Sequence, residues 1–237
     1  MQRLPHDSHP RTRRNLANDP SSRPADRAHN AVARTRVYAV LGGIASGKSA
    51  VARWLAGSGG EVLDADELVA ELFARDDFRR RVAQAFGPGV LLADGRIDRP
   101  GLARAVFGDG AARSLLESWT HPHVREQIRA RLEAARRAGV PRVILDVPLL
   151  LENEADHLLP AECDALIFVE APARERERRA METRGWESGE VARREALQLP
   201  LENKRGRAQH VIVNDGNREQ LKSAVETVLR TLEPTAV

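Results

Sequence analysis

Eight consecutive residues, GGIASGKS at 42–49, constrain this chain of 237 residues more than any other part of it. They follow VYAVL, an apolar and β-branched run that is typical of a buried parallel strand. The spacing G-x-x-x-x-G-K-[ST] between a strand and a helix predicts a loop whose backbone N–H groups surround phosphate oxygens. A glycine-rich turn that binds no ligand is the alternative.

Lysine is rare in this chain, with three lysines beside 34 arginines, so Lys48 at this position is informative. We expect Lys48 to contact the terminal phosphates of ATP and the Ser49 hydroxyl to ligate Mg²⁺. The helix after the loop should run from about Lys48 to Ala56. The loop residues predicted to bind ATP are Gly43, Ala45, Ser46, Gly47, Lys48, Ser49 and Ala50.

Four further apolar runs predict strands at 61–63, 142–147, 165–170 and 210–214. Helical patterns lie between them, including a helix from about 65, two helices within 99–138, arginine-dense sequence at 172–205 and a last helix at 217–231. Strands separated by helices predict an α/β fold with a five-stranded parallel sheet flanked by helices.

The N-terminal residues 1–36 carry eight Arg and three Asp among many Pro, Ser and Asn, which predicts a disordered, Arg/Pro-rich tail. The domain should therefore span 37–234, whose sequence is not basic, and we expect no nucleic-acid partner. The chain has no long apolar run and no secretory signal, so we expect a cytoplasmic protein without a membrane partner. Cys163 stands alone and predicts a small buried side chain beside a strand.

The class of nucleotide-binding protein follows from what accompanies the loop. GTPases need an N-K-x-D motif and ABC-type ATPases need a signature such as L-S-G-G-Q, and the chain has neither. A small-molecule kinase remains, and it needs a carboxylate near the acceptor hydroxyl. Asp64-Ala65-Asp66 follows the second predicted strand, at the sheet edge where the loop also lies, although a helix cap is the alternative role.

Other polar residues fit the same edge of the sheet. Asp146 ends the strand at 142–147 and is predicted to hold Mg²⁺ opposite Ser49, with a simple turn role as the alternative. His121 and His123 form a weak zinc pattern, so we favour a capping or substrate contact for His121. The arginines at 174–184 form either a solvated helix face or a mobile lid that closes on ATP.

Taken in order, seven segments resemble the dephospho-coenzyme A kinases over residues 37 to about 230: GGIASGKS, LDADELVAELF, GRIDRPGLARAVF, LESWTHPHV, ILDVPLLLE, ARREALQLPLENKR and VIVNDG. The resemblance implies a P-loop kinase core, a helical substrate-binding insertion at about 66–138 and a lid at about 172–205. It implies ATP-dependent phosphorylation of the ribose 3′-hydroxyl of dephospho-coenzyme A, which gives coenzyme A and ADP in the final step of coenzyme A biosynthesis. A nucleoside or nucleotide kinase, or a catalytically silent nucleotide-binding module, is the alternative.

The resemblance also implies residue roles. Asp66 would be the base at the 3′-hydroxyl, and Arg179 or Arg184 would be the lid cation on the transferring phosphate. The dephospho-coenzyme A site would contain Asp64, Asp66, Arg99, His121 and Pro148. Gln198 and Asn214 would lie near the adenine of ATP. The partners are then ATP and dephospho-coenzyme A, and we expect a monomer or weak homo-oligomer.

Several positions differ from the family pattern. Leu41 stands where Thr is usual, Ala45 replaces a usual Gly, Ala50 replaces a common hydroxyl and His210 replaces a usual Asp. One extra residue near Thr183 separates the lid arginines. Backbone N–H groups carry most of the phosphate binding, so we expect these changes to affect rate more than reaction type.

Overall fold

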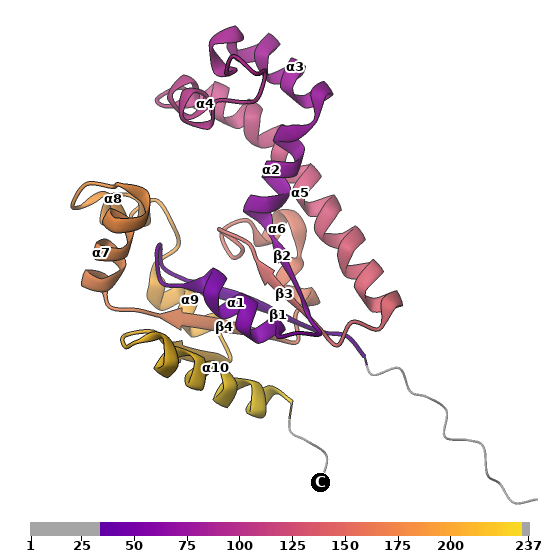
Figure 1. Cartoon of the computed structure of the whole chain (residues 1–237), viewed down its shortest axis with the longest axis vertical. Coiled ribbons are helices and arrows are strands. Elements are labelled where there is room, and N and C mark those ends of the chain that lie inside the picture. The colour runs from indigo at the N-terminus through magenta and orange to yellow at the C-terminus, as the bar shows by residue number, and fades with distance from the viewer. Residues whose placement is uncertain (1–33, 234–237) are drawn as a thin grey trace, which may run out of the picture. The chain divides into compact units, whose positions relative to one another are not determined.

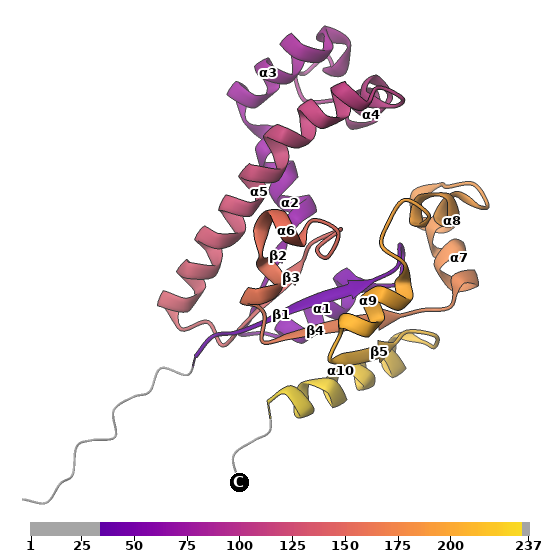
Figure 2. The same cartoon turned by 180° about the vertical axis from the view of Figure 1, so that it is seen from behind.

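The computed structural model describes residues 34–233, apart from the side chains of residues 156 and 157 (Figures 1 and 2). The predicted tail therefore lies outside the described residues, except for its last three positions. There the ordered pattern begins one residue earlier than expected, because Arg36 is already the first residue of strand β1.

The predicted five-stranded parallel sheet is confirmed. It consists of β1 (Arg36–Gly42), β2 (Glu61–Asp64), β3 (Arg142–Asp146), β4 (Ala165–Glu170) and β5 (His210–Val213) in the order β2-β3-β1-β4-β5. Every pair of neighbours is parallel. The chain passes from β3 on one side of β1 to β4 on the other, so the order reverses at β1, where ligands bind in open α/β sheets.

Side chains alternate between the two faces of the sheet, and both faces are covered. On β1, Tyr38 and Val40 pack under α1 (Lys48–Ala56) and α10 (Arg218–Leu232). Val37 and Leu41 point to the other face, which packs against α5 (Gly110–Ala138) and α9 (Leu201–Arg207). Continuous apolar strands such as VYAVL need this double cover.

A helical insertion follows β2 and has a core of its own. It contains α2 (Ala65–Ala74), α3 (Asp76–Phe86), the 3₁₀ turn η1 (Pro88–Val90), α4 (Arg99–Val106) and the first part of α5. Its buried side chains are Leu72, Phe78, Val82, Val90, Ile97 and Leu102. Figure 1 shows these helices extending beyond the sheet on the β2 side. The two helices predicted within 99–138 are confirmed as α4 and α5.

Short helices fill the remaining connections. Between β3 and β4 lie α6 (Glu154–His157) and the 3₁₀ turn η2 (Leu159–Glu162). Cys163, two residues before β4, is half-buried, so its expected burial is met only in part. Burial raises the pKa of the Cys163 thiol to about 12. Between β4 and β5, α7 (Ala173–Arg184) and α8 (Glu190–Glu195) precede α9. The arginine-dense segment is therefore three separate helices.

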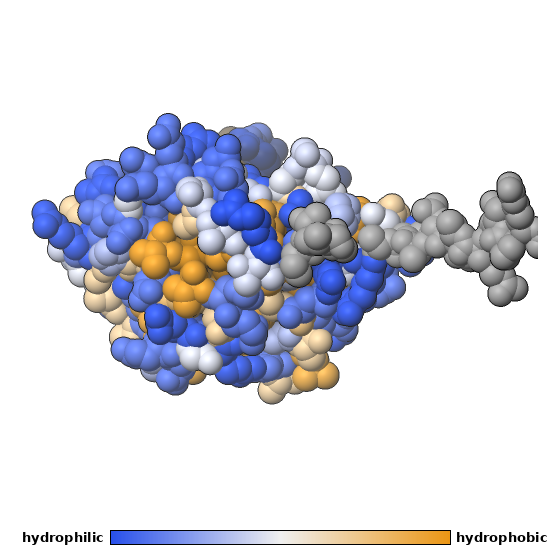
Figure 3. Space-filling view, turned by 90° about the horizontal axis from the view of Figure 1, so that it is seen from below, coloured by the Kyte–Doolittle hydropathy of each residue, from blue (hydrophilic) through white to orange (hydrophobic). Residues whose placement is uncertain are grey.

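The face on the side of α10 is mostly hydrophilic, with one larger patch of hydrophobic residues and several smaller ones (Figure 3). The amphipathic pattern of α10 explains its polar exterior, because Leu221 and Val225 turn inward to the sheet. Within residues 34–233, none of the helices combines the length and apolar character that a membrane crossing requires.

Candidate active site

The phosphate loop lies between the central strand β1 and α1, and Asn214 supports it from behind. Gly47 is the N-cap of α1 with φ 97°, a left-handed conformation that favours glycine. A Cβ atom there would lie 2.4 Å from Asn214 Nδ2. The same Nδ2 donates a hydrogen bond of 2.7 Å to the Ser46 carbonyl. Asn214 follows β5, so the edge strand of the sheet fixes the shape of the loop.

Lys48 lies back across the loop. Its Nζ donates to the Gly43 carbonyl at 2.8 Å and to the Gly42 carbonyl at 3.2 Å. Burial lowers the pKa of Lys48, while the Asp146 carboxylate acts in the opposite direction. Burial therefore disfavours the charged Lys48 ammonium, and a bound anion such as phosphate would stabilise it as a close charge partner.

A cavity of about 750 Å³ opens in front of the loop. It brings together twelve of the predicted site residues, namely Ala45, Ser46, Gly47, Lys48, Ser49, Ala50, Asp64, Asp66, Asp146, Pro148, Arg184 and Gln198. Five others do not line it, namely Gly43, Arg99, His121, Arg179 and Asn214. The twelve residues in the lining come from the loop after β1, from the ends of β2 and β3, and from the arginine-dense segment at 172–205.

Asp146 at the end of β3 faces the helix side of the loop. Its side chain is buried, and the Ser49 hydroxyl lies near it and lowers its pKa. Burial raises the pKa of Asp146, and the nearby Asp64 and Asp66 add to the rise. A hydroxyl and a carboxylate side by side are hard oxygen donors, the kind that Mg²⁺ prefers when phosphates and water complete its shell. The residues present therefore fit this ion.

The two aspartates at the end of β2 and the start of α2 differ in environment. Asp64 caps α2, because its Oδ1 accepts from the N–H of Asp66 at 2.8 Å and of Glu67 at 3.4 Å. The capping alternative thus holds for Asp64, which also lines the cavity. Asp66 lines the cavity and does not cap α2. Burial raises its pKa, and the nearby Asp64 adds to the rise.

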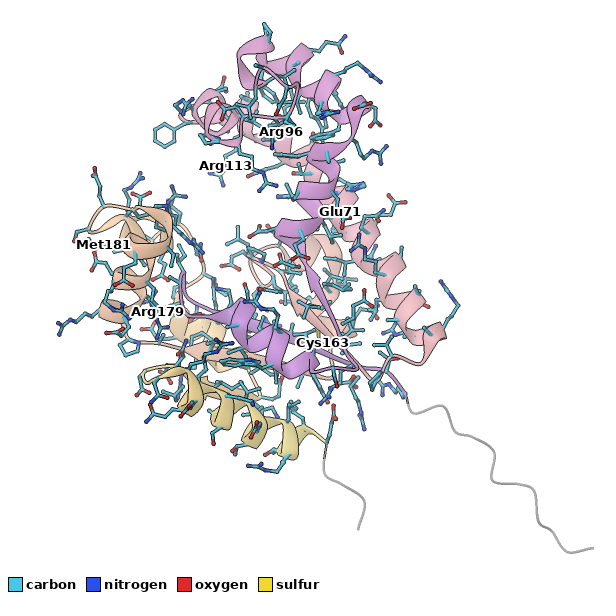
Figure 4. All side chains as sticks on the ribbon, in the orientation of Figure 1. Glu71, Arg96, Arg113, Cys163, Arg179 and Met181 are labelled. Carbon is cyan, nitrogen blue, oxygen red and sulfur yellow. The ribbon has the colours of Figure 1, made fainter. Side chains whose placement is uncertain are left out.

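The two candidate lid arginines lie in different places. Arg184, at the end of α7, lines the cavity, and its charge lowers the pKa values of Lys48 and Asp66. Arg179 instead donates to the Asn214 side-chain oxygen and carbonyl, both at 3.3 Å. Figure 4 shows Arg179 on the inner side of α7 and Met181 on its outer side. The geometry favours Arg184 as the cation that faces a ligand.

The helical insertion contributes residues that differ from those predicted. Arg99 lies outside the cavity lining, with its guanidinium 5.5 Å from the Phe73 ring, but its charge still lowers the pKa of Asp66. His121 is exposed on α5 and does not line the cavity. The insertion reaches the cavity through Ala103, Phe107 and Arg113. Figure 4 shows Arg113 on the side of the insertion that faces α7 and α8.

Sequence reasoning missed a second lysine in the site. Lys204 of α9 lines the cavity, is 5% exposed, and pairs with Glu152 at 2.7 Å. Its Nζ also donates to the Gln198 oxygen at 3.0 Å, which holds that predicted adenine contact in place. The rarity of lysine, which singled out Lys48, would have singled out Lys204 as well.

Replacing Asn214 by alanine should lower the melting temperature and raise KM for ATP. The buried side chain donates to Ser46, and an unsatisfied buried carbonyl costs about 1–3 kcal/mol. Calorimetry and ATP titration of initial rates measure both effects. Asn203→Ala, at an exposed position of α9, is the matched control. An Asn214→Ala protein with the wild-type KM would show that the loop keeps its shape without this support.

Together these features define a P-loop kinase: a glycine-rich loop at the switch point of a parallel sheet, a Ser–Asp pair and a cation-bearing segment over one cavity. The dephospho-CoA kinase family model matches residues 36–220. The chain belongs to this family.

Individual relatives agree over most of the chain. The dephospho-CoA kinase of Geobacter sulfurreducens is 38% identical over 193 residues, which cover 81% of this chain and 96% of the relative. That of Geobacillus kaustophilus is 37% identical over 197 residues, with 83% and 96% covered. A crystal structure from Thermus thermophilus is 37% identical with a TM-score of 0.68, covering 84% of this chain and 99% of its own. Dephospho-CoA kinase from Campylobacter jejuni has the same fold at 20% identity, with a TM-score of 0.60 and with 84% and 98% covered.

Proposed function

We propose that this protein transfers the γ-phosphoryl group of ATP to the ribose 3′-hydroxyl of dephospho-coenzyme A, which gives coenzyme A and ADP. The observation that carries the proposal is one cavity in which Lys48, Asp66 and Arg184 all face the same space. Family membership supports the choice of acceptor. The phosphate loop alone would support only nucleotide binding.

The proposed mechanism depends on positioning and charge. The loop N–H groups and Lys48 hold the terminal phosphates of ATP, and Arg184 neutralises charge that spreads over the transferring group. Asp66 accepts the proton of the 3′-hydroxyl at its carboxylate. Ser49 and Asp146 would hold Mg²⁺, which would supply further charge neutralisation on the phosphates when bound.

The acceptor experiment tests the substrate directly. Purified protein with ATP, Mg²⁺ and dephospho-coenzyme A should produce equal amounts of ADP and coenzyme A, which chromatography resolves. A panel of nucleosides and nucleotides addresses the alternative kinase. Turnover of one of these, without coenzyme A formation, would refute the proposed acceptor. ATP binding without transfer to any acceptor would favour the silent module.

Replacing Ser49 by alanine should raise the Mg²⁺ concentration required for half-maximal rate by about tenfold, since one oxygen ligand is lost while Asp146 remains. Rates measured across a magnesium titration at saturating ATP give this value. Ser223→Ala, on the exposed side of α10, is the control. An unchanged magnesium requirement would remove Ser49 from the metal site.

The same proposal gives roles to two parts of the chain, the helical insertion and the arginine-dense segment. The helical insertion at about 66–138 would bind the acceptor, which Ala103, Phe107 and Arg113 in the cavity wall support. The segment at about 172–205 would act as the lid, which Arg184 and Trp186 support. A cytoplasmic location and a monomer or weak homo-oligomer stay predictions.

A further inference from the structure

Two arginines of α7, Arg176 and Arg179, lie three residues apart and both reach the phosphate loop through a second side chain. Arg179 does so through Asn214, which supports the Ser46 carbonyl. Arg176 does so through Glu195, the last residue of α8. The connection through Glu195 therefore joins both α7 and α8 to the phosphate loop.

Glu195 has two hydrogen-bond donors on one oxygen. Its Oε1 accepts from the Ile44 backbone N–H at 2.7 Å and from Arg176 Nη1. Arg176 is anchored in turn, because its Nε donates to the Ala171 carbonyl at 3.1 Å. The side chains of Arg176 and Glu195 are only 7% and 15% exposed. With so little water around it, this carboxylate relies on these partners for its hydrogen bonds.

Gly43 shows how closely this pair packs against the loop. A Cβ atom at Gly43 would lie 2.6 Å from Arg176 Nη1 and 2.7 Å from Glu195 Oε1. Any larger residue would therefore displace the pair. Glycine at position 43, the second of the Gly42-Gly43 pair, is explained by this contact as well as by the approach of phosphate to the backbone.

The pair also acts on the lysine of the loop. The Glu195 carboxylate raises the pKa of Lys48, against the lowering by burial and by the charges of Lys204 and Arg184. A carboxylate at this place therefore supports the charged ammonium as well as the backbone beside it. Its own charge is neutralised by Arg176, so it adds little net repulsion toward an incoming phosphate.

We propose that Glu195 is a positioning residue of the ATP site, which fixes the Ile44 N–H and so the curvature of the phosphate loop, while Arg176 holds it there from the lid. The inference rests on the proposed function only in that the loop binds ATP. A purely structural pair would fasten α7 to α8 and leave the loop unaffected. If Glu195 positions the loop, its loss lowers ATP affinity and exposes the Ile44 amide to exchange. If the pair is purely structural, neither changes.

The experiment compares Glu195→Ala, Glu195→Gln and, as control, Glu187→Ala, which removes an exposed carboxylate of the same lid segment. Calorimetric titration with ATP alone gives Kd without any acceptor, and initial rates give KM and kcat. Glu195→Ala should raise Kd and KM for ATP by about tenfold, with a smaller effect on kcat. Glu195→Gln keeps an acceptor oxygen and should stay within about threefold of wild type.

Hydrogen exchange of the Ile44 amide supplies a readout that a structural pair would not move. The amide should be protected in the ATP-free wild type and in Glu195→Gln, and unprotected in Glu195→Ala. Free exchange in the wild type would overturn the proposal, even if Glu195→Ala does not fold. So would a Kd for ATP in Glu195→Ala within twofold of wild type. Wild-type protein that binds ATP but makes no coenzyme A would refute the proposed function and leave this comparison valid.

Discussion

Replacing Lys48 by alanine should lower kcat by on the order of a thousandfold, equivalent to about 4 kcal/mol of transition-state stabilisation. Lys48 is the cation of the phosphate loop itself, with Nζ within 3.2 Å of two loop carbonyls. Charge on the transferring group grows toward the transition state, so the loss should fall mainly on kcat. Steady-state rates of ADP and coenzyme A formation measure it.

The same variant should melt within a few degrees of wild type when no ligand is present. Burial lowers the pKa of Lys48, so removing the ammonium relieves a desolvation cost while it removes two hydrogen bonds. Lys222→Ala on α10, where the side chain is 63% exposed, controls for the loss of a lysine. If Lys48→Ala kept most of its activity, the phosphate site would have to lie elsewhere.

The strands and the loop could be predicted because local sequence determines them. VYAVL followed by GGIASGKS has a hydrophobic period and a glycine pattern that fit few conformations. The structure also explains why glycine is usual at position 45, since the φ of 58° is left-handed and costs Ala45, which has a Cβ, about 1–2 kcal/mol that glycine would not lose. The aspartates after β2 and β3 followed from the rule that parallel strands end at one edge.

The side chains of the arginine-dense segment at 172–205 could not be placed in the same way. Arg179 and Arg184 are five residues apart on a helix, so they point in different directions, and spacing alone does not say which one faces the loop. Lys204 of α9 pairs with Glu152 in the turn before α6, and Arg176 of α7 pairs with Glu195 of α8, so each pair depends on how separate segments pack. His121 shows the reverse case, in which a conspicuous residue of the sequence lies exposed outside the cavity lining.

Asp66 should set the acid side of the pH profile. Burial, with a further contribution from Asp64, raises the pKa of Asp66, although Arg184 and Arg99 act against the rise. The base must be unprotonated, so kcat/KM should fall as the pH drops through this raised pKa, which begins above the range of an ordinary aspartate. The measurement is kcat/KM for the acceptor across a pH series at saturating ATP.

Asp66→Asn should lower kcat by about a hundredfold or more, because the amide cannot accept the proton of the hydroxyl, and it should abolish the acid limb of the profile. ATP affinity should stay close to wild type, since Asp66 belongs to α2 and not to the phosphate loop. Glu67→Gln, at the next exposed position of α2, should keep both rate and profile. An Asp66→Asn protein that retained the wild-type acid limb would assign the titrating base to another carboxylate, and Asp146, whose pKa burial also raises, would be the next to test.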